Sequence, residues 1–260
     1  MGILNITPDS FSDGGDFFNI ENALLQTQKL VQAGADILDI GAQSTRPGAD
    51  IIGEKEEIKR LLPTLIEIRK NFPNLIISID TFNAEVAYEA LKNGANWIND
   101  VTGGKNDKSI LDVVADFDCP YVLTHSKGNS KTMNKLSVYN NLMEEIINSL
   151  LQLSESAINK KVRKDKIIWD PGLGFAKNKN HNIHILKNLD RLKSFDFPLL
   201  IGASRKRFIG EILDEDNPKE RDIGSLAISC FCSQLNIHMV RVHNVKMNNQ
   251  VLKIADKIFR

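Results

Sequence analysis

The chain has 260 residues, of which 42% are hydrophobic and 25% charged, so it can bury one large core, and a single domain over residues 1–260 is expected. Its 33 basic and 33 acidic residues cancel, which argues against a nucleic-acid or membrane partner and confines any anion site to a local cluster. Three cysteines are too few for a disulfide framework, and no apolar stretch reaches the roughly 18 residues needed to span a bilayer. We therefore expect a cytoplasmic protein.

Along the chain, short apolar runs alternate with stretches of helical periodicity. The run at residues 2–6 precedes a loop rich in Pro, Asp, Ser and Gly, and a helix is expected from about Asn19 or Glu21 to Ala33. Residues 54–70 carry apolar side chains at helical spacing, so they predict an amphipathic helix that Pro63 kinks. The other predicted elements are strands at 37–41, 75–80, 96–99, 120–124, 167–170, 198–202 and 238–242, and helices at 84–93, 108–117, 137–161, 181–194, 205–213, 219–235 and 246–258.

This alternation makes eight βα units in one chain, which is typical of an α/β protein with a (β/α)8 barrel of roughly 250 residues. The rival architecture is a doubly wound open sheet. Such a sheet usually carries a glycine-rich phosphate turn after one strand, and the sequence contains neither a G-x-G-x-x-G nor a Walker pattern. We therefore predict a TIM barrel, a parallel eight-stranded barrel with outer helices.

Most of the predicted strands end on a polar residue that can do chemistry. In a parallel barrel these strand ends meet at one face, where active sites lie, so the residues are expected to converge on one site. The residues in question are Asp39, Asp80, Asn99, Asp100, His125, Asp170, Ser204, Arg241 and His243.

Asp80, Asn99 and Asp170, with Asp39 and Asp100 nearby, make an acidic and amide set. Such a set could coordinate a metal, perform acid–base chemistry, or hydrogen-bond a flat heterocycle that displays N–H donors. For Asp39 and Asp100 taken singly, capping of the following helix is an equal alternative.

A second set is cationic. Alternation along the last strand places Arg241 inward beside His243, and Asn5 is adjacent once the barrel closes, so the three could bind a phosphate or pyrophosphate. The cationic set also contains Arg46, Lys177, Arg205, Lys206 and Arg207. Of these, Lys177 and Arg207 taken alone are expected to be solvated surface groups.

The histidines leave alternatives open. His125 is either catalytic or a hydrogen-bonded residue of the barrel rim, whereas His181 and His184 are expected to be surface groups of a helix. In the segment DPGLGF, Gly172 and Gly174 let the backbone approach a ligand and Phe175 offers a stacking surface, although an ordinary helix-start turn would use the same residues.

Seven motifs occur in order over nearly the whole chain: MGILNITPDSFSDGG, GAQSTRPGA, SIDT, WINDVTGG, WDPGLGFAK, GASRKRFIG and RVHNV. Together they resemble the dihydropteroate synthase family of folate biosynthesis. The resemblance implies a (β/α)8 barrel that condenses 6-hydroxymethyl-7,8-dihydropterin pyrophosphate with 4-aminobenzoate, giving 7,8-dihydropteroate and pyrophosphate by a dissociative displacement. It also implies a target of sulfonamides and a homodimer formed through late helices.

The resemblance also implies a role for each matching residue. Asp80, Asn99, Asp170 and Lys206 would bind the pterin. Asn5, Arg241 and His243 would hold the pyrophosphate, with Asn5 contributing to a magnesium site. The aminobenzoate would be covered by two loops, one carrying Asp9 and the other Thr45, Arg46 and Pro47, and it would lie beside Phe175 and Ser204.

Three positions depart from the family pattern. Thr124 and Ser126 flank His125 where methionines are common, and Gln43 replaces a frequent glutamate. Two alternative functions remain. A methyltransferase barrel acting on methyltetrahydrofolate and a corrinoid would share the pterin-binding acids but would not need the SRK, RVH and STRPG segments. A catalytically silent pterin-binding module would be expected to lose Asn5, Asp9, Arg46 or Arg241, and the chain keeps all four.

Overall fold

The computed structural model of the chain describes residues 1–6, 16–43 and 52–260, with side chains from residue 20 onward in the first helix. Eight parallel strands lie in these ranges: β1 (Gly2–Asn5), β2 (Ile37–Gly41), β3 (Ile76–Asp80), β4 (Trp97–Asp100), β5 (Tyr121–Thr124), β6 (Ile167–Asp170), β7 (Leu200–Ile201) and β8 (Met239–Val240). β1 to β6 pair in sequence order, and β7 pairs with β8.

Two single bridges complete the ring between these two sheets. Trp169 of β6 pairs with Leu199 just before β7, and Gly2 of β1 pairs with Val242 just after β8. The backbone N–H of Ile3 donates to the carbonyl of Val242, whose own N–H donates to the carbonyl of Met1. The eight strands therefore form the closed barrel that the sequence predicts.

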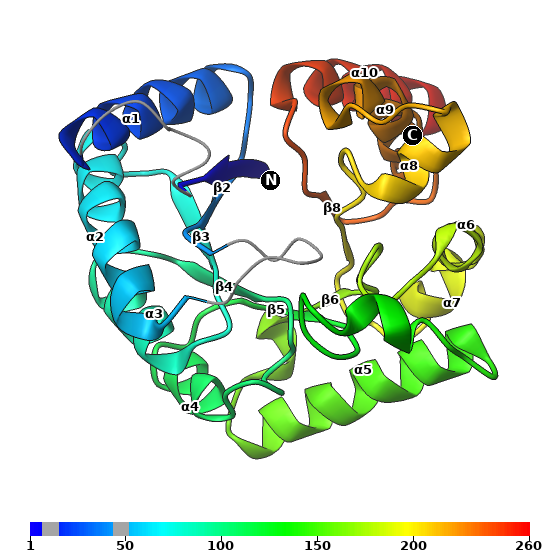
Figure 1. The fold of residues 1–260 in the computed structure, drawn as a ribbon, viewed down its shortest axis with the longest axis horizontal. Coiled ribbons are helices and arrows are strands. Elements are labelled where there is room, and N and C mark those ends of the chain that lie inside the picture. The colour runs from blue at the N-terminus through cyan, green and yellow to red at the C-terminus, as the bar shows by residue number, and fades with distance from the viewer. Residues whose placement is uncertain (7–15, 44–51) are drawn as a thin grey trace.

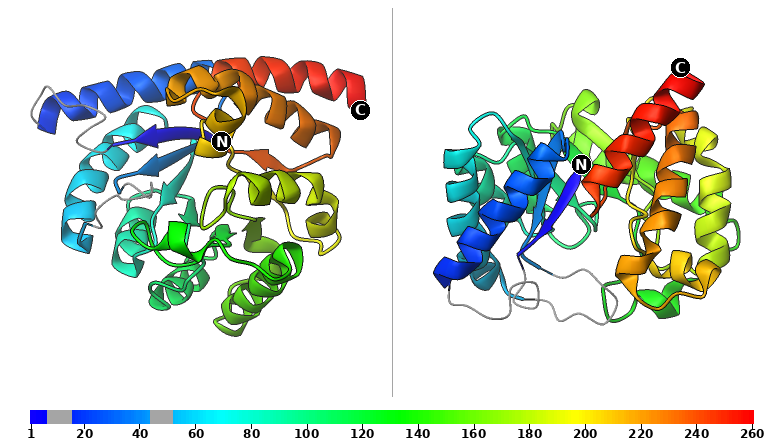
Figure 2. Two further views of the ribbon diagram at one scale, coloured as in Figure 1. Left: turned by 45° about the vertical axis from the view of Figure 1, so that its right-hand side comes forward. Right: turned by 90° about the horizontal axis from the view of Figure 1, so that it is seen from above.

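The helices surround the strands as an outer ring (Figure 1). In the two other views α1 and α10 take neighbouring places in this ring, as expected when the first and last strands meet (Figure 2). The helices are α1 (Asp16–Gln32), α2 (Glu54–Asn71), α3 (Ala84–Lys92), α4 (Ser109–Asp116), α5 (Leu142–Asn159), α6 (Lys179–Lys187), α7 (Leu189–Lys193), α8 (Arg207–Leu213), α9 (Asp222–Gln234) and α10 (Val245–Phe259), with 3-10 turns η2 (Met133–Leu136), η3 (Lys164–Lys166) and η4 (Pro218–Arg221).

The apolar core divides between the two faces of the strands. Residues such as Leu38, Ile40 and Leu123 point outward and pack with the inner faces of the helices in one large cluster. Val122, Ile168 and Leu200 form a separate small cluster with Met1, Trp97 and Met239. Because successive strand side chains point to opposite faces, this second cluster fills the barrel interior, and residues two positions further along each strand also point inward.

Some predicted helix boundaries differ from those of the structure. α1 begins at Asp16, earlier than predicted, and α5 begins only at Leu142 because the side chain of Asn141 caps it by accepting from the N–H of Glu144. The predicted helix at 181–194 is two helices, α6 and α7, separated at Asn188. α2 continues through Pro63 as one helix.

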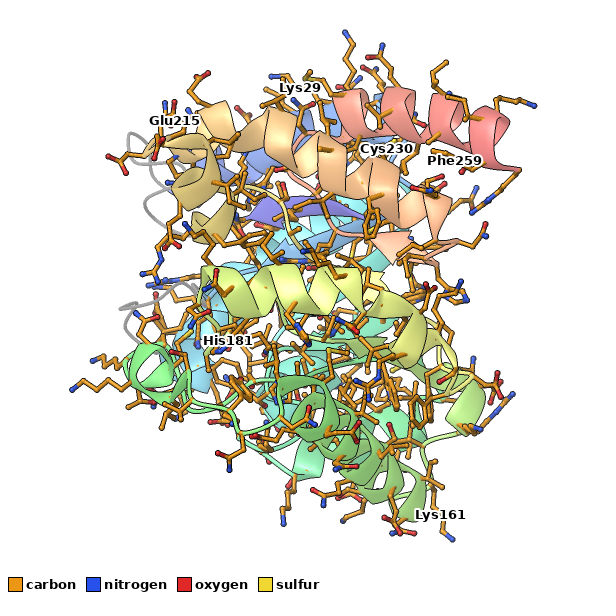
Figure 3. The ribbon with its side chains drawn as sticks, turned by 90° about the vertical axis from the view of Figure 1, so that its right-hand side faces the viewer. Lys29, Lys161, His181, Glu215, Cys230 and Phe259 are labelled. Carbon is orange, nitrogen blue, oxygen red and sulfur yellow. The ribbon has the colours of Figure 1, made fainter. Side chains whose placement is uncertain are left out.

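In the described ranges, none of the helices combines the length and the apolar character needed to cross a membrane. The three cysteines are free thiols. Side chains of the helical shell cover the outer surface, as seen for Lys29 on α1, Cys230 on α9 and Phe259 on α10 (Figure 3).

Candidate active site

Polar side chains form the layer above the apolar interior of the barrel. Asn99, Thr124, Asp170 and Arg241 each follow by two positions a residue of the interior cluster, so they point into the barrel toward its carboxyl end. Asp39 and Ser78 pair in register on β2 and β3 and are fully buried. Buried polar groups in such number indicate a binding site rather than a packing core.

Arg241 joins the cationic set directly to the acidic set. Its Nε lies 2.6 Å from Asp39 Oδ2, and its Nη2 lies 2.7 Å from Asp80 Oδ2. Asn99 Nδ2 donates to the same Asp39 oxygen at 3.1 Å. Residues from β2, β3, β4 and the end of β8 thus meet at one point inside the barrel.

Burial sets the electrostatics of this group. Burial raises the pKa of Asp80 to about 7, while Arg241 acts in the opposite direction and Asp39 adds like-charge repulsion. Burial lowers the pKa of Arg241, but Asp39 and Asp80 more than offset this, so its pKa lies above the ordinary value and the guanidinium stays charged. Two buried carboxylates therefore share one cation.

Asp170 and Lys206 are two further charged residues of the same polar layer. The N–H of Gly172 donates to Asp170 Oδ1 at 2.7 Å, and burial raises the Asp170 pKa while the charge of Lys206 lowers it. Lys206 donates through Nζ to the carbonyl of Leu173, and its Nζ lies 4.6 Å from the centre of the Phe175 ring. Burial lowers the Lys206 pKa to about 8.

Several buried polar atoms in this layer lack a hydrogen-bond partner in the described part of the chain. They are Asp39 Oδ1, Ser78 Oγ, Asp80 Oδ1, Thr124 Oγ1 and Gln43 Oε1. Native proteins rarely leave such atoms unsatisfied, so a set of five at one end of a barrel points to a polar ligand that supplies the partners.

Asn5 lies next to the acidic residues. A Cβ placed on Gly41 would lie 3.7 Å from Asn5 Oδ1 and 3.7 Å from Asp80 Oδ2, so the two side chains flank this glycine. Asn5 and His243 also line a groove of about 480 Å³, together with Arg205 and with residues of β1 and α1. The remaining lining residues are Ile3, Leu4, Asn22, Leu25, Gln26 and Lys29.

Ser204 orients His243 in this groove. The backbone N–H of His243 donates to Ser204 Oγ at 3.1 Å, and the same oxygen lies 3.0 Å from His243 Nδ1. Arg205 is committed elsewhere, because its Nε and Nη2 bind the two oxygens of Asp222 at 2.7 and 2.9 Å. The structure thus supplies a physical role for Ser204 that the sequence did not suggest.

The structure gives different roles to Asp39 and Asp100, the two aspartates for which helix capping was an alternative. Capping is wrong for Asp39, whose Oδ2 accepts from Nε of Arg241 at the end of β8. Asp100 instead holds the following turn, since its carboxylate accepts from the N–H and hydroxyl of Thr102, the N–H of Gly104 and the hydroxyl of Tyr121. Four donors saturate Asp100, and it has no capacity left for a ligand.

Two further expectations about charged residues have opposite outcomes. Lys177 was expected at the surface, and that prediction is wrong, because its side chain is buried against His125. Arg207 is exposed and pairs with Glu211 on its own helix, as predicted. No local pattern in the sequence marks Lys177 for burial, because its environment depends on how the loop between β6 and α6 folds.

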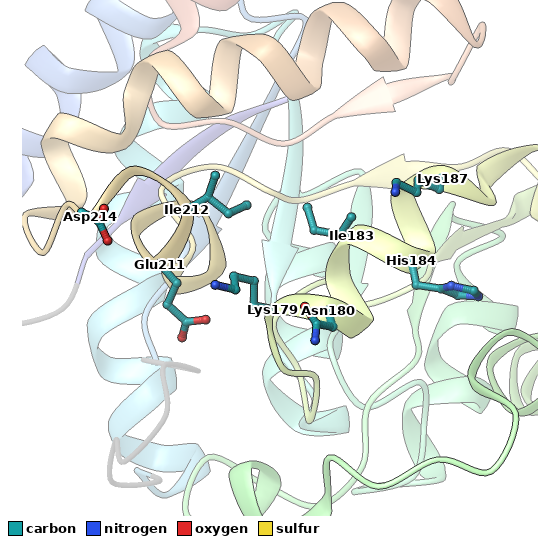
Figure 4. Close-up of a pocket in the computed structure, with 8 residues that line it drawn as sticks. All are labelled: Lys179, Asn180, Ile183, His184, Lys187, Glu211, Ile212 and Asp214. Carbon is teal, nitrogen blue, oxygen red and sulfur yellow. The ribbon is translucent and has the colours of Figure 1, made fainter.

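His181 and His184 do not belong to the site. His181 completes the capping box at the start of α6, where its Nδ1 accepts from the N–H of Asn178. His184 lines an outer groove of about 500 Å³ between α6 and α8, with Lys179, Glu211 and Asp214 (Figure 4). This groove contains none of the strand-end residues.

Four of the proposed site residues, Asp9, Thr45, Arg46 and Pro47, lie outside the described residues. In the described ranges, no group of three or more His, Cys, Asp and Glu side chains could hold a metal ion by itself.

Comparison with known proteins agrees with this arrangement. The family of pterin binding enzymes matches residues 1–243. A dihydropteroate synthase of Synechocystis is 45% identical over 260 residues, covering all of this chain and 90% of the relative. A dihydropteroate synthase structure from Clostridium difficile, determined in the presence of pteroic acid, is 39% identical with a TM-score of 0.94, covering 100% of this chain and 96% of the other.

A Xanthomonas albilineans dihydropteroate synthase with 4-aminobenzoic acid is 36% identical with a TM-score of 0.93, covering 99% of this chain and 92% of the other. At these identities over full length, both the sequence and the fold are shared. The chain therefore belongs to the family of pterin-binding enzymes, as one of its dihydropteroate synthases.

Proposed function

We propose that this chain condenses 6-hydroxymethyl-7,8-dihydropterin pyrophosphate with 4-aminobenzoate to give 7,8-dihydropteroate and pyrophosphate. One observation carries the proposal. Arg241, a cation suited to a departing diphosphate, contacts Asp39 and Asp80, and these belong to the acids suited to a pterin. Heterocycle recognition and anion release can therefore occur at one place.

The acidic residues match the pterin ring. Asp170 keeps one oxygen beyond its bond to Gly172, and this oxygen can accept from the 2-amino group and neighbouring ring N–H of the pterin. Asp80 Oδ1 and Thr124 Oγ1 have no partner in the described structure and can satisfy other ring atoms. Lys206 can reach the polar edge of the ring from the opposite side.

The chemistry follows from the distribution of charge. As the C–O bond at the pterin methylene breaks, its electrons leave with the pyrophosphate and positive charge develops on the pterin, which the buried carboxylates stabilise. Arg241, His243 and Asn5 can hold the departing anion. The neutral aniline nitrogen then bonds to the methylene carbon and its proton passes to water, so orientation matters more than a strong base.

Magnesium fits the residues present. Mg²⁺ prefers oxygen ligands and is usually held by one or two protein oxygens with substrate phosphates and water. Asn5 Oδ1, beside Asp80, offers such an oxygen at the place where the pyrophosphate would lie. When bound, the ion would neutralise charge on the leaving group.

The aminobenzoate would lie toward Phe175 and Ser204, beyond the pterin. Phe175 is held near Lys206, and Ser204 lies beside His243, so both are close to the proposed reaction centre. The relative with bound 4-aminobenzoic acid supports this substrate. Because the family is a known target of sulfonamides, we expect competition between these drugs and the aminobenzoate.

The proposal includes a homodimer in the cytoplasm. Late helices carry exposed apolar side chains that a second copy could cover, namely Ile212, Leu213, Ile223, Met247, Ile254, Ile258 and Phe259. The free cysteines are consistent with a reducing compartment.

Steady-state release of pyrophosphate separates the candidate functions. With pterin pyrophosphate, 4-aminobenzoate and Mg²⁺ together, release should be fast, and omission of the aminobenzoate or chelation of Mg²⁺ should suppress it. A silent module would bind pteroic acid without release. A methyltransferase would instead move a methyl group from methyltetrahydrofolate to a corrinoid. Absence of release with all components present would refute the synthase proposal.

A further inference from the structure

The loop between β6 and α6 is irregular and mostly buried. Three of its residues, Gly172, Gly174 and Ala176, have φ angles of 70°, 81° and 48°, so the chain alternates in and out of the left-handed region. One turn of this backbone is satisfied internally, since the N–H of Phe175 donates to the carbonyl of Gly172 at 3.1 Å. Buried carbonyls need partners, and side chains supply the donors for the carbonyls of Leu173, Phe175 and Ala176.

Lys177 supplies the central donor. Its Nζ lies 3.0 Å from the carbonyls of both Gly172 and Phe175, 3.3 Å from the carbonyl of His125, and 2.9 Å from His125 Nδ1. The side chain is 5% exposed. A single ammonium thus ties the loop after β6 to the end of β5.

Other donors reach the same loop from different directions. Lys206 donates to the Leu173 carbonyl, the Tyr139 hydroxyl donates to the Ala176 carbonyl, and the N–H of Gly174 donates to Asn182 Oδ1. Lys177 differs from these because its four acceptors come from two strand ends. Its loss would remove this donor from the carbonyls of Phe175, in the loop after β6, and of His125, at the end of β5, whereas the Gly172 carbonyl keeps the N–H of Phe175.

The contact also bears on the proton of His125. When Lys177 is an ammonium, which carries three hydrogens and no lone pair, the Nδ1 atom that faces it accepts and the ring proton lies on Nε2. Burial lowers the pKa of Lys177, and the nearby charge of Asp170 raises it. Protonation of the ring is opposed by burial first and then by the charges of Lys177, Lys105 and Lys127, which lower the pKa of His125. These lysines come from three separate loops. The centre of the Tyr139 ring lies 6.2 Å from the centre of the His125 ring.

The loop that Lys177 holds carries groups of the proposed pterin site. The N–H of Gly172 donates to the Asp170 carboxylate. Lys206 donates to the carbonyl of Leu173, and its Nζ lies over the Phe175 ring. We propose that Lys177 is a positioning residue, which fixes this loop and the Nε2–H tautomer of His125 and so orients Asp170 and Lys206 for the pterin. This inference rests on the proposed function but adds a residue that touches no substrate.

The spectroscopic test uses protein labelled with ¹⁵N on its histidine rings. The His125 signals are identified by their loss in His125→Asn. In the wild-type protein, the His125 ring should stay neutral from pH 6 to 8, with a protonated Nε2 and an accepting Nδ1. A ring that titrates in this range, or a proton on Nδ1, would overturn the inference without any variant of Lys177.

The functional test compares Lys177→Met with Lys179→Met, an exposed control two residues away. Lys177→Met should weaken binding of pteroic acid and lower kcat/KM for the pterin substrate by about 10- to 100-fold, the usual cost of losing a group that orients binding residues. Its His125 ring should also titrate or change tautomer. Lys179→Met should match the wild type.

An unchanged kcat/KM and unchanged ring signals in folded Lys177→Met would contradict the inference. If Lys177→Met does not fold, Lys177→Gln, which keeps two donors but not the charge, replaces it with the same expectations and the same contrary result. Pteroic acid binding and the ring signals require no turnover. Failure of pyrophosphate release alone would therefore refute the proposed synthase activity and leave this inference standing.

Discussion

Three residues from distant parts of the sequence, Asp39, Asp80 and Arg241, decide the character of the site. The guanidinium lies 2.6 and 2.7 Å from the two carboxylates, in a layer where both acids are almost completely buried. Removal of one partner from a buried ion pair leaves an uncompensated charge and costs about 3 to 5 kcal/mol. Arg241 therefore stabilises the fold and prepares the site at the same time.

Arg241→Ala tests both consequences. We expect turnover to fall by about 10²- to 10³-fold, since one electrostatic stabiliser is lost, and the free energy of unfolding to fall as well because two buried acids lose their cation. Steady-state kinetics and denaturant titration measure the two effects. Arg207→Ala, which removes an exposed arginine paired with Glu211 of α8, is the control. A turnover loss below tenfold would exclude the role given to Arg241.

The pH dependence of kcat/KM for the pterin substrate should be bell-shaped. Asp80 must be ionised to stabilise the positive charge that develops on the pterin, and burial raises its pKa to about 7, so activity should rise as pH passes that value. Lys206 makes its stronger, charge-assisted hydrogen bonds when protonated, and burial lowers its pKa to about 8, so activity should fall above it. In Lys206→Arg the alkaline limb should move to higher pH. A flat profile from pH 6 to 9 would argue against both groups.

At the scale of elements, short strands and glycines leave room for the ligand. β7 contains only Leu200 and Ile201, and Gly202 follows with no side chain to fill the space beside Asp170. The β6–α6 loop has the opposite property, because a Cβ on Gly172 would lie 2.0 Å from the carbonyl oxygen of His125. Gly202 thus leaves space for the ligand, and Gly172 lets the loop pack against the backbone of His125.

Gly202→Ala and Gly172→Ala should therefore fail differently. An added Cβ at Gly202 meets only Asp170 Oδ2, at 3.7 Å, so Gly202→Ala should fold with near-normal stability but bind pteroic acid more weakly. Gly172→Ala should be less stable as well, since its φ of 70° and the backbone contact both oppose a side chain. Thermal unfolding and calorimetric titration give the two readouts. Equal loss of stability in both variants would contradict this distinction.

At the scale of the whole molecule, the sequence predicted the architecture because the hydrophobic alternation is local. It also predicted that Asp80, Asn99, Asp170 and Arg241 converge, since parallel strand ends meet at one face. It could not predict that Arg241 bridges Asp39 and Asp80, because the length and rotamer of a side chain across the barrel are not encoded in strand order. Burial of Lys177 was missed because it depends on how one irregular loop folds over a neighbouring strand.

The exposed apolar side chains of the late helices predict association of two copies. Light scattering should give a mass twice the 29.1 kDa of one chain. Ile254 and Ile258 lie on the same face of α10 and are 64% and 69% exposed, so replacing both by glutamate should shift the equilibrium toward monomer if that face contributes. Lys253→Glu on the same helix serves as the control. A monomer at micromolar concentration in the wild type would refute the dimer.

The most direct measurement is a crystal structure with a pterin and pyrophosphate bound in the presence of Mg²⁺. The account predicts the pterin ring between Asp80, Asn99 and Asp170, with its N–H donors at the Asp170 carboxylate, and the pyrophosphate within hydrogen-bond distance of Arg241, His243 or Asn5. A pterin bound in the outer groove between α6 and α8, or a pyrophosphate out of reach of all three of these residues, would contradict it.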